Sequence, residues 1–180
     1  MTREIPPSPI APDPIRRGLL VSGATGVVAG TLAMPWPVPA GATQQAALSL
    51  RVVAPPPATA ITYDAHGLEA LGVTGLTTAV PWDSQPRHWE GVTLRRLATA
   101  VRAAGHPLLV KALNDYAAHI PWSDLERYDP LLAWLRDGQP IPIRAKGPLI
   151  VIYPFTDRPE LRGDIYNGRS VWHVSEIVFE

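Results

Sequence analysis

Apolar residues along the chain gather in short runs, most of them alternating with polar residues or bounded by Pro and Gly. Such runs are typical of strands, and the clearest one, Leu149-Ile150-Val151-Ile152-Tyr153, lies between Pro148 and Pro154 as a buried strand would. The same pattern predicts further strands over residues 46–53, 59–63, 73–80, 108–112, 131–136 and 170–179. The run over 131–136 also fits a helix, although the Asp137-Gly138 pair after it favours a hairpin turn.

Helical spacing is clearest over residues 93–104, where Leu94, Leu97 and Val101 share one stripe. Shorter helical segments are predicted at two other places, from an N-cap at Asp64 to about residue 72 and over residues 123–126. Short strands with two or three small helices predict an α+β domain with mixed, partly barrel-like sheets.

Residues 1–42 have the layout of an export signal. The pair Arg16-Arg17 opens a weakly hydrophobic run rich in Gly and Ala, and Ala40-Gly41-Ala42 offers a cleavage site of small residues. This layout matches the twin-arginine type. An uncleaved membrane anchor is the alternative, although prolines follow a run that is short for a bilayer span of about 20 residues. We expect cleavage after Ala42, a mature domain over 43–180 in the periplasm, and no membrane insertion after cleavage.

Composition narrows the chemistry further. The chain has 180 residues, and its 16 basic and 16 acidic residues cancel without forming blocks, so a nucleic-acid partner is not expected. It contains no cysteine, which excludes disulfides, thiolate metal sites and thiol nucleophiles. The five histidines form no HxH or HxxxH pair, and there is no GxSxG elbow, so we assign no metal ligand and no catalytic residue.

Motifs from about residue 64 to residue 179 resemble one known family. They include Thr77-Thr78-Ala79-Val80-Pro81-Trp82, Trp89-Glu90-Gly91-Val92-Thr93-Leu94, Ala112-Leu113-Asn114-Asp115-Tyr116, Gly147-Pro148-Leu149 and Arg169-Ser170-Val171-Trp172. In this order they resemble the small stand-alone members of the sulfite-oxidase-fold, or oxidoreductase molybdopterin-binding, family. The resemblance implies a sulfite-oxidase-like molybdopterin-binding fold.

One feature departs from the enzymes of that family, which hold molybdenum partly through a cysteine thiolate. The equivalent loop by order is residues 78–82, where Val80 and Pro81 offer no ligand. Some small relatives are periplasmic regulators that sense a reduced pterin and control a membrane-bound cyclic-di-GMP enzyme. The missing cysteine and the export signal resemble that branch. The resemblance therefore implies a pterin or molybdopterin-like ligand without molybdenum, and the periplasmic domain of such an enzyme as a partner.

A pterin is a flat ring with a donor-acceptor edge, so its pocket needs an aromatic face, an amide or carboxylate, and a group for orientation or charge. Residues of these types in the motifs are Trp82, Trp89, Asn114, Asp115, Tyr116, Arg144 and Lys146. Each has a structural alternative. The tryptophans could be core or rim packing, the polar run at 114–116 an Asx turn, and the two cations a solvated hairpin rim.

These observations favour an exported pterin-binding sensor or regulator over a redox enzyme. Two alternatives remain. One is a molybdopterin-dependent oxidoreductase whose metal is held without cysteine, and the other is an accessory module with an empty pocket.

Overall fold

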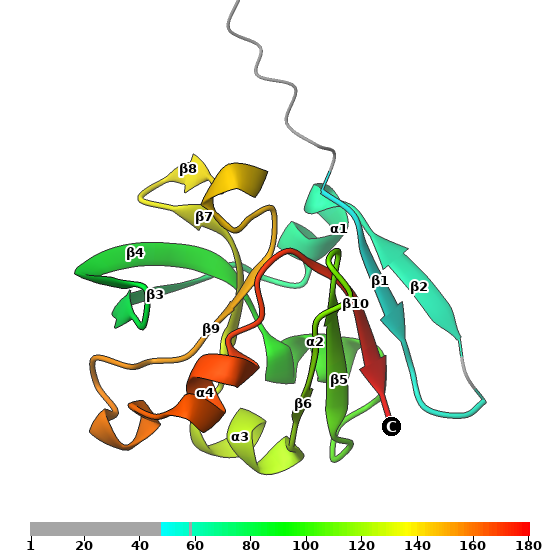
Figure 1. The fold of residues 1–180 in the computed structure, drawn as a ribbon. Coiled ribbons are helices and arrows are strands. Elements are labelled where there is room, and N and C mark those ends of the chain that lie inside the picture. Colours follow the sequence, from blue (N-terminus) through cyan, green and yellow to red (C-terminus); the bar gives the residue numbers. More distant parts are fainter. Residues whose placement is uncertain (1–47, 58) are drawn as a thin grey trace, which may run out of the picture. The chain divides into compact units, whose positions relative to one another are not determined.

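The computed structural model describes residues 48–57 and 59–180 (Figure 1). The export signal predicted over residues 1–42 lies outside this part of the chain. Among the described residues, no helix is both long and apolar enough to cross a membrane.

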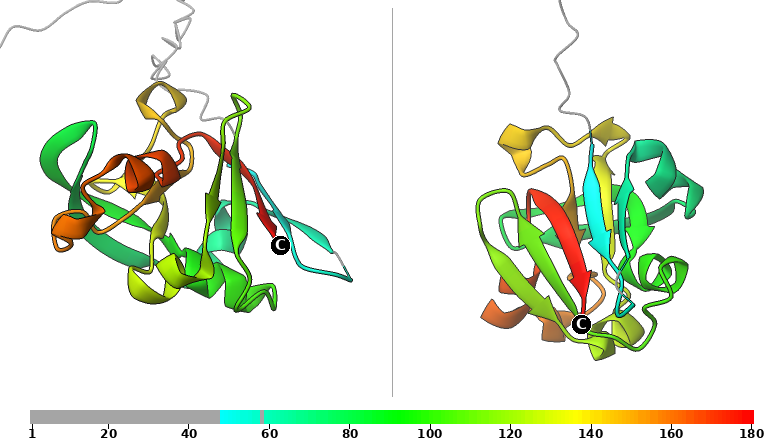
Figure 2. Two further views of the ribbon diagram at one scale, coloured as in Figure 1. Left: turned by 60° about the horizontal axis from the view of Figure 1, so that its bottom comes forward. Right: turned by 90° about the vertical axis from the view of Figure 1, so that its right-hand side faces the viewer.

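The first sheet is built around the C-terminal strand. Its order is β2–β1–β10–β5–β6, in which β1 runs parallel to β10 and the other pairs are antiparallel. The strands are β1 (Leu50–Val53), β2 (Ala60–Tyr63), β5 (Leu108–Ala112), β6 (Ala117–Ile120) and β10 (Val174–Phe179). The register places Ile177 between Val52 and Val110, and all three side chains are fully buried, so one face of this sheet covers the core. The right-hand view of Figure 2 looks onto this sheet, with β10 between β5 and β1.

The second sheet is antiparallel and has the order β3–β4–β7–β8, with β9 paired to β7. Its strands are β3 (Thr74–Val80), β4 (Asp83–Thr93), β7 (Leu131–Arg136), β8 (Gln139–Pro140) and β9 (Ile150–Ile152). The two sheets do not close into a barrel. Separate sheets with short helices confirm the predicted α+β class. The prediction of a partly barrel-like arrangement was wrong.

Short helices connect the strands. They are α1 (Ala65–Ala70), α2 (Leu94–Ala100), α3 (Trp122–Arg127) and α4 (Asp164–Arg169), with 3₁₀ turns η1 (Ile143–Ala145) and η2 (Pro159–Leu161). Asp64 caps α1 as predicted, because its carboxylate accepts a hydrogen bond of 2.8 Å from the Gly67 amide. Helix α2 ends four residues earlier than expected. Arg102, just beyond it, has φ +58°, which no α-helix continues.

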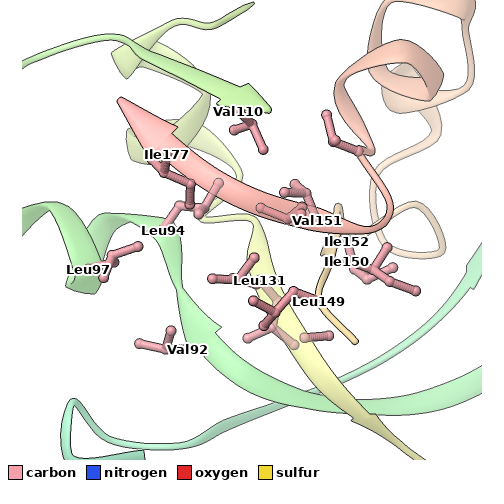
Figure 3. Close-up of a cluster of buried hydrophobic side chains, with 14 of the residues drawn as sticks. Val92, Leu94, Leu97, Val110, Leu131, Leu149, Ile150, Val151, Ile152 and Ile177 are labelled. Carbon is pink, nitrogen blue, oxygen red and sulfur yellow. The ribbon is translucent and has the colours of Figure 1, made fainter. Parts of the chain in front are cut away.

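The core lies between the two sheets, where side chains of both sheets and of α2 meet (Figure 3). Leu94 and Leu97 of α2 are fully buried there, as are all residues from Leu149 to Tyr153. Each such apolar side chain contributes roughly 1.5–3 kcal/mol through burial.

Candidate functional site: a tryptophan and lysine cluster

The loop that follows β3 is held by two threonines. Thr78 is fully buried, and its hydroxyl oxygen accepts a hydrogen bond of 3.0 Å from the Thr156 amide. In return, the Thr156 hydroxyl oxygen accepts a hydrogen bond of 3.0 Å from the Ala79 amide. These reciprocal bonds fasten the end of β3 to the segment after β9. The loop that begins there carries Trp82.

Trp82 meets a lysine and a second tryptophan at the protein surface. The rings of Trp82 and Trp172 lie nearly parallel, with 6.3 Å between centroids and 16° between planes. The Lys146 ammonium lies 2.8 Å from the centroid of the Trp172 ring and 5.3 Å from that of Trp82. We call Trp82, Lys146 and Trp172 the tryptophan–lysine cluster. Trp172 as a whole remains 42% exposed, and the His173 ring lies 6.0 Å from its ring, so the solvent-facing part of Trp172 is what a ligand could contact.

Two backbone segments hold the cluster in place. Lys146 has φ +77°, and its carbonyl accepts a hydrogen bond of 3.1 Å from the His173 amide. The next residue, Gly147, must lack a side chain, because a Cβ there would overlap the backbone carbonyl of Ile141. His173 Nδ1 donates a 2.6 Å hydrogen bond to the Gly147 carbonyl, which places the ring proton on that nitrogen. These two hydrogen bonds hold the backbone around Lys146 beside the backbone around Trp172.

The charge of Lys146 is poorly compensated. Burial against the rings lowers the pKa of its ammonium. Cation–π attraction to the tryptophans favours the charged form, typically by about 0.5–2 kcal/mol. Within the part of the chain that the structure describes, no carboxylate forms an ion pair with Lys146. The Lys146 ammonium could therefore donate a hydrogen bond to an oxygen atom of a ligand.

The other predicted tryptophan lies elsewhere. Trp89 on β4 is only 1% exposed, and its indole N–H donates a hydrogen bond of 3.2 Å to the Thr78 carbonyl. Its ring therefore has no face available for stacking on a ligand. The structural alternative, core packing, describes this residue, and we leave it out of the site.

The polar run at 114–116 turns the chain between β5 and β6. Asp115 has φ +63°, and the Ala112 amide donates to the Tyr116 carbonyl at 2.8 Å, closing the hairpin. The Leu113 amide donates to the His173 carbonyl at 2.9 Å, so this turn lies beside the segment that carries Trp172. Asn114 and Asp115 are exposed there and serve the turn without contacting the cluster through any hydrogen bond between described residues.

Tyr116 and Arg144 complete the predicted set. The Tyr116 hydroxyl donates a hydrogen bond of 2.9 Å to the Gly168 carbonyl, which ties the β5–β6 hairpin to α4. Arg144 is exposed on η1, and its side chain makes no hydrogen bond or ion pair with another described residue. The structure therefore brings Trp82 and Lys146 together, sets the 114–116 turn near them, and leaves Arg144 free in solvent.

A cavity of about 410 Å³ borders the same loop. Its lining consists of Ala79, Val80, Pro81, Phe155, Thr156, Arg162, Gly163 and Asn167. Sequence reasoning missed Trp172, Arg162 and Asn167. Trp172 lies within a motif already noted, so the sequence offered its aromatic ring as a candidate, whereas the segment from 154 to 167 has no periodicity that marks a site.

A buried polar network fixes α4, the helix that precedes Trp172. One carboxylate oxygen of Asp124 accepts hydrogen bonds of 2.9 Å from both the Tyr153 hydroxyl and the Arg169 guanidinium. Tyr153 is fully buried, and this burial, with the nearby carboxylate, raises the pKa of its hydroxyl. Helices α3 and α4 are thereby joined to β9.

The residues present do not fit molybdenum. In the loop where a metal ligand would be expected, the Thr78 hydroxyl is already bonded to Thr156, and Ala79, Val80 and Pro81 have no ligating side chain. No group of three or more His, Asp or Glu within residues 48–57 and 59–180 could hold a metal ion.

Comparison with known proteins supports the fold alone. No family model and no curated protein matches the sequence. Among solved structures, the sulfane dehydrogenase SoxCD from Paracoccus pantotrophus is similar, with a TM-score of 0.51 and 12% sequence identity. The likeness covers 73% of this chain but only 37% of that one. It agrees with the sulfite-oxidase-like fold expected from the sequence.

Proposed function

We propose that the protein binds a pterin-type small molecule at the tryptophan–lysine cluster and acts as a ligand-binding sensor or regulator rather than a redox enzyme. One observation carries this proposal. Trp82 and Lys146 were selected from the sequence for stacking and for charge, and they meet at the exposed ring of Trp172.

Each part of the cluster suits a planar heterocycle. The open part of the Trp172 ring offers a stacking surface, which for nucleic-acid bases is worth about 1–3 kcal/mol per ring. The Lys146 ammonium can donate a hydrogen bond to a carbonyl oxygen at the edge of the ligand ring. This contact is favourable because the ammonium is partly desolvated and forms no ion pair with a described carboxylate. Asn114 and Asp115 lie on the neighbouring turn, which the Leu113–His173 hydrogen bond holds beside the cluster, and their amide and carboxylate are the groups proposed for the donor edge.

The cellular setting of this proposal rests on the sequence. The twin-arginine layout of residues 1–42 supports export to the periplasm, and the resemblance supports the periplasmic domain of a membrane-bound cyclic-di-GMP enzyme as the regulated partner. Replacing Arg16→Lys and Arg17→Lys together should retain the full-length chain in the cytoplasm, as measured by cell fractionation. Unchanged periplasmic recovery of the double variant would contradict twin-arginine export.

Binding is tested by calorimetric titration of the purified protein with tetrahydrobiopterin. We expect saturable binding at about micromolar concentration, and a loss of tenfold or more in both Lys146→Met and Trp172→Leu. Arg144→Met is the matched control, since it removes a nearby cation outside the cluster. No saturation up to about 1 mM, or an equal loss in Arg144→Met, would overturn the proposed site.

The oxidoreductase alternative is tested on protein isolated from its native periplasm. Measuring bound molybdenum separates the two functions directly. Stoichiometric molybdenum would overturn the sensor proposal, whereas a released pterin without the metal would support it.

A further inference from the structure

The 410 Å³ cavity beside the loop shares no lining residue with the tryptophan–lysine cluster. We infer that it is a second binding site, which takes a small monocarboxylate with an apolar body. This inference does not rest on the proposed pterin function, because different side chains carry it.

One side of the cavity is apolar. Val80 and Pro81 line it from the end of β3, and Phe155 lines it from the segment after β9. Phe155 is itself only 5% exposed, so it presents a fixed hydrocarbon surface. Small-molecule sites usually measure about 300–1,000 Å³, so this cavity suits a ligand near the lower end of that range.

The polar groups are Arg162 and Asn167. Neither side chain makes a hydrogen bond or an ion pair with any other residue that the structure describes, although acidic residues such as Glu160 and Asp164 lie close in sequence. A guanidinium presents a planar fork of N–H donors that matches the two oxygens of a carboxylate. A primary amide adds donors at the same end of the ligand.

The third polar side chain in the lining is already engaged. The Thr156 hydroxyl is bonded to the Ala79 amide and lies 3.2 Å from the Thr78 hydroxyl. Recognition of a ligand head group therefore falls to Arg162 and Asn167. A single guanidinium balances one negative charge, which favours a monocarboxylate over a phosphate, and the apolar wall favours an organic body over a bare inorganic anion.

The frame of the cavity is rigid. Leu161 is fully buried and anchors η2, the turn that precedes Arg162. The backbone N–H of Asn167 donates a hydrogen bond of 3.1 Å to the Gly163 carbonyl. The Arg169–Asp124 ion pair at 2.9 Å fixes the end of α4. The backbone around the cavity is thus anchored, while the exposed side chains of Arg162 and Asn167 can adjust to a ligand.

The test uses benzoate as the probe and benzamide as its uncharged counterpart, in ¹H–¹⁵N chemical-shift titrations of the purified protein. We expect saturable shifts with benzoate at Ala79, Val80 and the non-proline residues from 155 to 167, and binding of benzamide at least about tenfold weaker. Inorganic phosphate should bind at least about tenfold more weakly than benzoate. Failure of benzoate to saturate up to about 10 mM, or equal binding of phosphate, would overturn the inference.

Variants assign the effect to these side chains. Arg162→Gln should weaken benzoate binding about tenfold or more, and Asn167→Asp should weaken benzoate binding more than benzamide binding, because the new carboxylate repels only the charged ligand. Arg158→Gln is the matched control, because Arg158 is an exposed arginine on the other side of η2 and does not line the cavity. Equal losses in Arg158→Gln and Arg162→Gln would contradict the site. Lys146→Met should leave benzoate binding unchanged, so failure of the pterin proposal and failure of this one are distinguishable.

Discussion

Replacing Asp124 by alanine is expected to destabilise the domain by about 2–4 kcal/mol. The Asp124 side chain is 6% exposed and accepts hydrogen bonds from Tyr153 and Arg169 through one oxygen. Without it, the fully buried Tyr153 hydroxyl loses its acceptor, which costs about 1–3 kcal/mol. The Arg169 side chain is 24% exposed and regains some water, so its share is about 1 kcal/mol, below the cost for a fully buried pair.

Urea unfolding followed by circular dichroism measures this loss, with Asp157→Ala as the control at an exposed aspartate that has no side-chain hydrogen bond or ion pair among the described residues. The double variant Asp124→Ala with Tyr153→Phe should lose less than the sum of its single variants, because both remove the same hydrogen bond. A free energy of unfolding for Asp124→Ala within about 0.5 kcal/mol of wild type would refute the reasoning, as would strict additivity.

Three further outcomes are expected. Gly147→Ala should destabilise the domain by about 2 kcal/mol or more in urea unfolding and weaken pterin binding, because its Cβ overlaps the Ile141 carbonyl and displaces Lys146; wild-type stability would contradict this. Burial raises the folded-state pKa of Tyr153, so wild-type stability should fall as pH rises above about 10, where tyrosine ionises in the unfolded chain, and Tyr153→Phe should fall less steeply in urea titrations. Burial lowers the folded-state pKa of Lys146, so its contribution to stability should rise with pH up to its unfolded pKa of about 10.4. Lys146→Met should lack that rise, and identical pH profiles would count against it.

The strands that could be recognised from the sequence are those with continuous apolar runs or with Pro or Gly residues at their ends. Strand β9 lies at residues 150–152 within the predicted run, and β7 is a strand rather than a helix because β4 and β9 flank it on both sides. Strand β4 was missed. Its first half, from Asp83 to His88, carries polar residues and Pro86, and only its second half is buried. Such a strand becomes visible only when its partners are known.

The β4–β7 pairing also shows why pattern alone falls short. A Cβ on Gly91 would overlap the backbone of Leu132, so the two strands approach more closely there than side chains would permit. A glycine in the sequence is compatible with a turn, a bulge or a close approach. The neighbouring strand decides between these, and that strand lies about 40 residues away in the chain.

The candidate site, too, could be predicted from the sequence only in part. Residue types suited to a flat ligand were present in the motifs, yet the sequence could not show whether Trp82 and Trp89 bind a ligand or pack in the core, since both are tryptophans in family-like motifs. The structure separates them, because Trp89 is buried in the core, whereas Trp82 is half-buried and stacks against the exposed Trp172.

The sequence by itself determined the α+β class, the Asp64 cap, the most apolar strands, the absence of a cysteine ligand, and the residue types available for stacking and charge. These follow from local composition and short-range periodicity. Only the tertiary structure decided that Lys146 lies on Trp172 and that Arg162 and Asn167 border one cavity with Pro81. These residues come from segments far apart in the chain. Their proximity depends on the tertiary fold, which local sequence patterns do not reveal.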